Sequence, residues 1–275
     1  MSHHIVRVHA RPAGKCGGSG STCLNGLNQT LVDWRLEHFA EIDSTSNYCL
    51  ARAKAGDPVG LAVLADVQTA GRGSRGRDWV STPGNMHLSV LLRPEYEISS
   101  LNCFPLLAGL AVAQALMQLG SAAMTPVLKW PNDVLMGGAK VAGILIDASP
   151  SNGRIEWLVM GIGINLAFAP QIPGRFTTCL AEHGVTVAPL VAAQTVLASL
   201  SGWLEAFEAQ GAAFIQTAWL QAAHPLGTAI SVRGVDVTTQ GRFAGLSPTG
   251  ALQLCVENRI ETFQTGEIWL GGQGG

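Results

Sequence analysis

A long uncharged stretch in the first half of the chain limits what this sequence can fold into. Between Glu97 and Lys129 there is no Asp, Glu, Lys or Arg, and a run of roughly 20 apolar residues is long enough to span a bilayer. However, Gln114 and Gln118 lie one helical turn apart within it, so a helix here carries a polar stripe. The stretch therefore predicts a buried core helix over residues 105–119, with one edge in water, and no membrane span.

The composition supports a large folded core. Apolar residues make up 47% of the 275 residues and charged residues 13%, whereas disordered chains combine low hydrophobicity with high net charge. The formal net charge of −2 provides no bulk positive field for wrapping nucleic acid. The six cysteines form no C-x-x-C pair, and a core of this size does not need a disulfide framework. We expect reduced thiols, a cytoplasmic protein and no metal site of its own.

Apolar runs that alternate with helical segments predict an α+β fold. Strand-type runs occupy residues 59–65, 87–92, 127–130, 141–147 and 155–164, and helical segments occupy residues 47–55, 105–119, 189–210 and 213–222. Ser44 and Thr45 can cap the first helix, which Gly56 ends. Residues 66–85 are rich in Gly, Arg, Ser and Thr and predict a long loop.

The same pattern divides the chain into three regions. Residues 1–35 are glycine-rich and predict a flexible extension that is too short for a helix-turn-helix domain. Residues 36–224 predict the large domain. After His224 and Pro225, short strands separated by glycine turns predict a small all-β domain over residues 225–275.

Three glycines in the long loop match a dinucleotide-binding pattern. Gly71, Gly73 and Gly76 follow G-x-G-x-x-G, but that pattern requires a helix to open at the glycines. Here the chain continues into Ser81-Thr82-Pro83-Gly84, which breaks a helix. The context therefore argues against a dinucleotide fold.

The arginines of this loop favour a different chemistry. Arg72, Arg75 and Arg77 place three guanidinium groups within six positions, and guanidinium groups next to glycine amides suit phosphate oxygens. Trp79 offers a flat face for a ring such as adenine. We interpret the segment as a phosphate-binding loop; the alternative is a solvated, mobile arginine loop.

Two further clusters carry polar groups next to apolar strands. Lys129 ends one strand, and a buried cation is costly unless it is paired. Asn132 and Asp133 follow in a turn, and Lys140 enters the next strand; a hairpin whose polar residues only shape the turn is the alternative.

A glycine-containing strand provides the last cluster. The segment Gly161-Ile162-Gly163-Ile164-Asn165 ends an apolar run, and glycines inside a strand often mark the close approach of a ligand or of another backbone. Asn165 would contact such a ligand; packing against a helix is an equally good interpretation of the glycines.

Taken in order, these segments resemble the biotin–protein ligase family. The resemblance covers about residues 39–270 and rests on residues 43–47, 71–79, 129–133, 140–144 and 161–165, which follow the family's order. It implies a class II synthetase-like catalytic domain, in which helices flank a mixed β-sheet, followed by a small C-terminal β-barrel. It also implies the form without an N-terminal DNA-binding domain.

The resemblance implies roles for individual residues. The biotin-binding residues would be Ser44, Thr45, Ser46, Gln68, Arg72, Gly73, Ser74, Lys140 and Gly143. The ATP-binding residues would be Arg75, Arg77, Trp79, Lys129, Asn132, Asp133 and Asn165. Lys140, Arg72 and Arg77 would be catalytic, because two anionic reactants must be neutralised and aligned. ATP, biotin and Mg²⁺ are the expected cofactors, with the magnesium bound to ATP.

One position departs from the family's loop, which commonly reads Gly-Arg-Gly-Arg. The fourth residue here is Ser74, so one positive charge near the acyl phosphate is missing. We therefore expect the activated intermediate to be held less tightly.

The resemblance also implies a protein partner, namely the biotin carboxyl-carrier protein of acetyl-CoA carboxylase or a related carboxylase. A monomer and a homodimer are both compatible with the sequence. A lipoate or octanoate ligase or transferase of the same fold is the close alternative, although a transferase needs a nucleophilic thiol and no cysteine lies in the three clusters. A DNA-binding repressor and a non-catalytic biotin-binding module are more distant alternatives. Residues 1–35 are too short for a helix-turn-helix domain, and a binding module would give Lys140 and the arginine loop no role.

Overall fold

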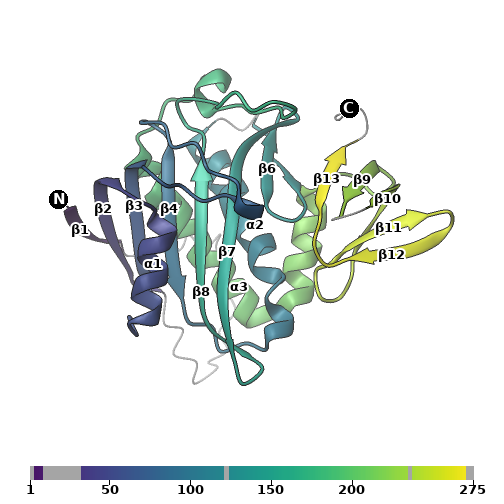
Figure 1. The fold of residues 1–275 in the computed structure, drawn as a ribbon, viewed down its shortest axis with the longest axis horizontal. Helices are drawn as coiled ribbons and strands as arrows, with labels where there is room; N and C mark the ends of the chain where they lie inside the picture. The colour runs from purple at the N-terminus through teal and green to yellow at the C-terminus, as the bar shows by residue number, and fades with distance from the viewer. Residues whose placement is uncertain (1–2, 9–31, 121–123, 235–236, 271–275) are drawn as a thin grey trace, which may run out of the picture.

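An eight-stranded mixed sheet forms the centre of the protein in a computed structural model that describes residues 3–8, 32–120, 124–234 and 237–270 (Figure 1). The strand order is β1-β2-β3-β4-β8-β7-β6-β5. The strands are β1 (His3–Val8), β2 (Trp34–Ile42), β3 (Leu61–Gln68), β4 (Met86–Leu92), β5 (Val127–Lys129), β6 (Asp133–Met136), β7 (Ala139–Ser151) and β8 (Arg154–Ile164). The β2–β3 pair is parallel and the other pairs are antiparallel, so the predicted mixed sheet is confirmed.

Helices cover both faces of this sheet because successive strand residues point to opposite sides. On β4, Leu88 and Val90 join the core formed with α2 (Cys103–Leu119) and α3 (Pro189–Ala222). Leu91 points the other way, into a smaller cluster with Cys49 and Ala53 of α1 (Thr45–Lys54). Figure 1 shows α1 in front of the sheet and α3 behind it.

The uncharged stretch is the buried core helix that the sequence predicts. Phe104, Leu107 and Leu116 of α2 are fully buried, and α2 packs on both α3 and the sheet. Within the described residues, Ile98–Leu119 and α3 are long and apolar enough to cross a membrane. Buried core helices share this length and composition.

In the first sheet and the helices that cover it, the structure differs from the sequence expectations in three strands and one helix. β1 pairs antiparallel with β2, so a flexible extension is wrong for residues 3–8; residues 9–31 lie outside the described part. The strands β2 and β6 were not predicted. The two helices expected at residues 189–222 form one element, α3, interrupted at Gly211, which has a φ of 75°.

A second sheet follows α3 and packs against the first domain. Its strands, in the order β12-β11-β10-β9-β13, are β9 (Ala229–Arg233), β10 (Thr238–Leu246), β11 (Leu252–Val256), β12 (Arg259–Phe263) and the unpredicted β13 (Glu267–Leu270). The Trp130 indole donates a hydrogen bond to the Gly250 carbonyl at 3.2 Å, which joins the two sheets. The described strands form an antiparallel sheet that is compatible with the expected small barrel, with no pairing between β12 and β13 to close it.

The described cysteines are free thiols. Cys49, Cys103 and Cys179 are buried and Cys255 is half-buried. Cys16 and Cys23 lie outside the described residues.

Candidate active site

Three neighbouring pockets share Ser74 and Lys140. The hydroxyl pocket, about 460 Å³, is lined by Thr45, Ser46, Gln68, Arg72 and Ser89 among others. The apolar pocket, about 870 Å³, is lined by Trp79, Val80, Asn165, Pro170 and Ile172 among others. The cationic pocket, about 740 Å³, is lined by Arg75, Arg77, Lys129, Asp133 and Glu267 among others. Since Ser74 and Lys140 belong to all three linings, they lie where these pockets meet, and Lys140 provides the charged group there.

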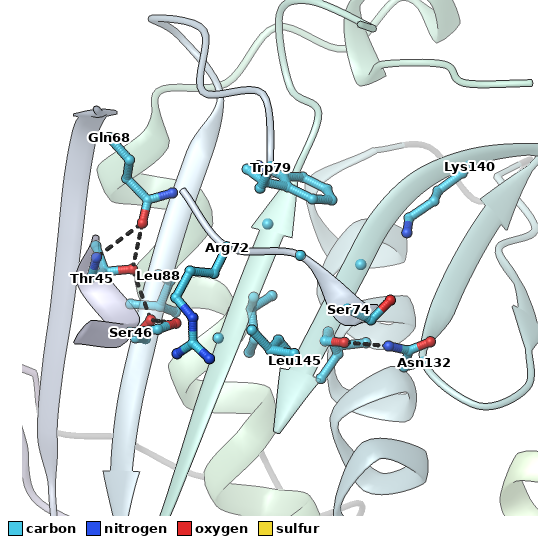
Figure 2. A pocket seen from close by; sticks show the side chains of 17 residues that line it. Thr45, Ser46, Gln68, Arg72, Ser74, Trp79, Leu88, Asn132, Lys140 and Leu145 are labelled. Carbon is cyan, nitrogen blue, oxygen red and sulfur yellow. Dashed lines mark hydrogen bonds between the residues drawn. The ribbon is translucent and has the colours of Figure 1, made fainter. Parts of the chain in front are cut away.

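The hydroxyl pocket is built at the start of α1. The backbone amide and the hydroxyl of Thr45 donate to the side-chain oxygen of Gln68 at 2.9 Å and 3.1 Å. The side-chain NH2 group of Gln68 donates to the Ser81 hydroxyl at 3.1 Å. The hydroxyl of Ser89 lies 2.8 Å from that of Thr45 and 3.0 Å from that of Ser46. Figure 2 shows Thr45, Ser46 and Gln68 on one side of the pocket and Trp79 and Lys140 on the other. This network presents fixed donors and acceptors to an uncharged polar ligand.

Ser44 has a different position from its neighbours. Its side chain is buried and accepts a hydrogen bond from the Asn47 amide at 3.4 Å, which caps α1. It does not belong to the lining of the hydroxyl pocket, whereas the other expected biotin-binding residues do. Sequence reasoning missed Ser89, whose hydroxyl in an otherwise apolar strand was the available signal.

The glycine–arginine loop folds back on itself instead of opening a helix. The Trp79 amide donates to the Gly71 carbonyl at 2.9 Å, and the Gly73 amide donates to the Arg77 carbonyl at 2.7 Å. Arg75 takes a left-handed conformation with a φ of 61°. The geometry agrees with the sequence argument against a dinucleotide-binding helix.

Arg72 ties this loop to the sheet. Its guanidinium donates to both carboxylate oxygens of Asp147 on β7, at 3.0 Å and 3.2 Å. A bidentate pair of this kind fixes both position and orientation. The guanidinium therefore lies at the edge of the hydroxyl pocket, with a carboxylate partner that the sequence did not identify.

Trp79 lies over two glycines of neighbouring strands. A Cβ atom at Gly163 would lie 2.4 Å from two carbons of the indole ring, and one at Gly143 would lie 3.1 Å from the ring. The Lys140 ammonium is 5.6 Å from the ring centroid. The indole nitrogen is buried without a hydrogen-bond partner among the described residues. The glycines are thus needed for the close approach of an aromatic side chain that lines two pockets.

The Lys140 ammonium points into the site from β7. It lies 2.5 Å from a carboxylate oxygen of Asp133 on β6. Asn132 lies just before β6, and its side-chain amide donates to the Ile144 carbonyl at 2.6 Å. Lys140 is therefore paired with the Asn132-Asp133 turn, which anchors one side of the site.

Lys129 lies on the cationic side of the site. Burial lowers the pKa of Lys129, and the nearby Asp133 carboxylate opposes that shift. The ammonium is 6.0 Å from the centroid of the Trp269 ring. Asp133 is therefore the carboxylate neighbour of both lysines.

Three arginines converge on one carboxylate of the second sheet. Arg77 donates to both oxygens of Glu267 at 3.1 Å and 3.0 Å, and Arg75 lies 3.7 Å from Glu267. Arg175 also forms an ion pair with Glu267. Arg175 and Glu267 were not expected from the sequence, because both are distant in sequence from the arginine loop.

Asn165 closes the apolar pocket at the end of β8. It is buried, and its amide donates to the Thr178 carbonyl at 3.1 Å. Its side-chain oxygen has no partner among the described residues, so it can accept a hydrogen bond from a ligand.

The arrangement suits the joining of two different ligands. A hydrogen-bonding pocket holds a small polar molecule, and a cationic pocket stabilises a polyanion beside it. Lys140, at their junction, can neutralise a carboxylate next to a phosphate. These features define an enzyme that activates a small acid with a nucleotide.

Comparison with known proteins agrees with this class. The profile of the biotin/lipoate A/B protein ligase family matches residues 39–165. A biotin–[acetyl-CoA-carboxylase] ligase of Paracoccus denitrificans is 35% identical over 216 residues, which cover 76% of this chain and 90% of the relative. The bifunctional ligase/repressor BirA of Escherichia coli is 32% identical, covering 83% of this chain and 72% of the relative.

A solved structure gives the same assignment. The biotin protein ligase from Aquifex aeolicus in complex with biotin and ATP has a TM-score of 0.73 and 31% sequence identity, covering 86% of this chain and 97% of the other. The chain belongs to the biotin–protein ligase family. The resemblance stated from the sequence motifs is thereby confirmed, as is the expectation of a ligase.

Proposed function

We propose that this ligase activates biotin with ATP and then transfers it to a lysine of a carrier protein. The observation that carries the proposal is that the hydroxyl, apolar and cationic pockets meet at Lys140. Relatives that are biotin–[acetyl-CoA-carboxylase] ligases and the Aquifex aeolicus ligase in complex with biotin and ATP support it.

In the first step, a carboxylate oxygen of biotin attacks the α-phosphorus of ATP. The new O–P bond gives biotinyl-AMP, and pyrophosphate leaves with the electron pair of the broken P–O bond. Both reactants are anionic, so the protein must neutralise charge and align them. Lys140 would contact the carboxylate and the α-phosphate, Arg72 would lie along the activated carboxyl, and Arg77 would bind the phosphates.

Magnesium belongs to this step as the counter-ion of ATP. In the part of the chain that the structure describes, no three His, Cys, Asp or Glu side chains lie close enough together to hold a metal ion. We therefore propose that Mg²⁺ is bound mainly by the phosphates of ATP, where it reduces their negative charge.

In the second step, the neutral amine of an acceptor lysine attacks the biotinyl carbonyl. The amide bond forms, AMP leaves and the amine loses its proton. No covalent enzyme intermediate is required. None of the described thiols lines any of the three pockets, so the proposal does not include a cysteine nucleophile.

We further propose that the acceptor is the biotin carboxyl-carrier protein of acetyl-CoA carboxylase or a related carboxylase, and that the enzyme acts in the cytoplasm. Relatives that are biotin–[acetyl-CoA-carboxylase] ligases support this choice of carrier. We propose that the reaction involves neither DNA nor a membrane, and that the enzyme acts as a monomer or a homodimer.

A transfer assay tests this function. The enzyme is incubated with ATP, magnesium, a carrier domain and either biotin or lipoate, and the carrier mass is measured. We expect biotin to be added, and the mass to stay unchanged when the acceptor lysine of the carrier is replaced by arginine. Addition of lipoate in preference to biotin would overturn the proposed specificity.

A further inference from the structure

The ion-pair cluster around Glu267 contains more positive than negative charge. Arg75, Arg77 and Arg175 all approach this single carboxylate, which leaves two positive charges without a counter-ion among these four residues. The side chains of Glu267 and Arg175 are 20% and 25% exposed, whereas those of Arg75 and Arg77 are 42% and 39% exposed. The cluster therefore lies at the wall of the pocket, where like charges repel one another and a bound anion relieves that repulsion.

The rest of the lining does not remove this excess. The side chains that carry positive charge in the apolar and cationic pockets are Arg75, Arg77, Lys129, Lys140 and Arg175, and those that carry negative charge are Asp78, Asp133 and Glu267. Five cations against three carboxylates again leave a surplus of two. The joined pockets are therefore suited to a ligand with several negative charges.

Arg175 is held in place by a tight turn. Its amide donates to the Ile172 carbonyl at 3.1 Å, with Pro173 and Gly174 at the two central positions and a φ of 71° at Gly174. This residue choice is the one that a type II turn requires. The Thr177 hydroxyl donates to the Pro170 carbonyl at 2.6 Å and closes the segment.

The same segment is bonded directly to the backbone of the central lysine. The Lys140 amide donates to the Phe176 carbonyl at 2.8 Å, and the Thr178 amide donates to the Lys140 carbonyl at 2.9 Å. Arg175 also lines the apolar pocket together with Trp79 and Asn165. The backbone of Arg175 is therefore fixed relative to Lys140, and its guanidinium lies between the apolar pocket and Glu267.

We propose that Arg175 is a further ATP-binding residue, which contacts the two phosphates that leave as pyrophosphate. Glu267 holds Arg75, Arg77 and Arg175 together before ATP arrives, and the triphosphate then competes with it for the three guanidinium groups. Arg72 and Lys140 border the hydroxyl pocket, whereas these three arginines gather at Glu267. This inference rests on the proposed function, because it assigns part of the ATP site.

Separating the two half-reactions tests the inference. For Arg175→Gln, the KM for ATP is measured from biotin-dependent pyrophosphate release without acceptor, and transfer is measured from purified biotinyl-AMP. We expect the KM for ATP to rise about 10- to 100-fold, as for loss of hydrogen bonds to a charged group. Transfer from biotinyl-AMP should match wild type, because that substrate lacks the two leaving phosphates. Arg175→Lys should recover part of the affinity.

A second variant separates phosphate binding from a purely structural role. If Arg175 acts only by holding Glu267, Glu267→Gln must also raise the KM for ATP. We expect Glu267→Gln to lower that KM, because it removes the competing anion. Arg259→Gln, an exposed residue of β12 in the same sheet, is the matched control. An unchanged KM in Arg175→Gln, or an equal rise in Glu267→Gln, would overturn the inference; a wild-type enzyme without biotin-dependent release would instead refute the proposed function.

Discussion

The close contact between Trp79 and Gly163 gives the sharpest prediction. In Gly163→Ala the new Cβ would lie 2.4 Å from two carbons of the indole ring, whereas carbon atoms normally pack at about 3.5–4.0 Å. Gly163 lies on β8, between β4 and β7, so its backbone cannot move away easily. We expect the indole ring to shift by about 1 Å or more.

The size of the effect follows from the cost of overpacking, which is about 1–3 kcal/mol. If the overpacking destabilises only the ligand-bound state, in which the ligands hold the ring in place, binding weakens by about 5- to 150-fold. Trp79 lines both the hydroxyl and the apolar pockets. The KM values for biotin and ATP should therefore both rise, with ATP affected more strongly because Trp79 is the proposed adenine neighbour.

Acceptor-free pyrophosphate release, measured against each substrate, reads out this effect. Gly202→Ala is a suitable control, because Gly202 lies in α3 with nothing within 4 Å of its added Cβ. Alanine there should stabilise the helix by up to about 1 kcal/mol and leave both KM values unchanged. Unchanged KM values in Gly163→Ala, in protein that unfolds cooperatively, would refute the role given to the ring.

Three further predictions concern single residues of the same region. Lys140→Ala should lower the rate of biotin adenylation by about 10²- to 10³-fold without unfolding the protein; full activity would rule out its assignment. Ser74→Arg should slow the dissociation of biotinyl-AMP by about 10-fold or more, because it adds a guanidinium beside the intermediate; an unchanged dissociation rate in a rapid-dilution assay would contradict this. Burial lowers the pKa of His87, so protonation favours the unfolded state and stability falls as the pH drops below about 6.5. Urea unfolding at pH 7.5 and 5.5 should show a smaller fall in the free energy of unfolding for His87→Leu than for wild type. Part of the fall should remain in the variant, because the pKa of His224 is also lowered; equal falls in the two proteins would exclude a contribution from His87.

Much of the fold could be predicted because the signals are local. The cap at Ser44 and the uncharged run of α2 identify their helices directly. β2 was missed because Arg35, Glu37 and Glu41 interrupt its apolar pattern. Glu37 is nevertheless buried, since it accepts hydrogen bonds from Tyr48 at 2.9 Å and from Arg35 at 3.3 Å. A charged residue can therefore be buried in a strand when partners from other segments form hydrogen bonds with it, and the sequence pattern does not show such partners.

The site was predictable where chemistry is concentrated in short segments. The glycine–arginine loop and the Lys129–Asp133 and Lys140 segments do line the three pockets. Ser89 was missed although its hydroxyl interrupts an apolar strand, whereas Asp147, Arg175 and Glu267 were not predictable, because each is brought to the site by strand register or by contacts between the two sheets. β1 was missed for the same reason, since its pairing with β2 joins distant segments.

Pyrophosphate release without an acceptor protein tests the proposed chemistry most directly. Wild-type enzyme is supplied with ATP and magnesium and with biotin, lipoate or neither acid, and pyrophosphate is measured over time. We predict release that depends on biotin, together with biotinyl-AMP detected by mass spectrometry. If folded protein releases no pyrophosphate with either acid, adenylation of biotin in the pockets around Lys140 would be contradicted.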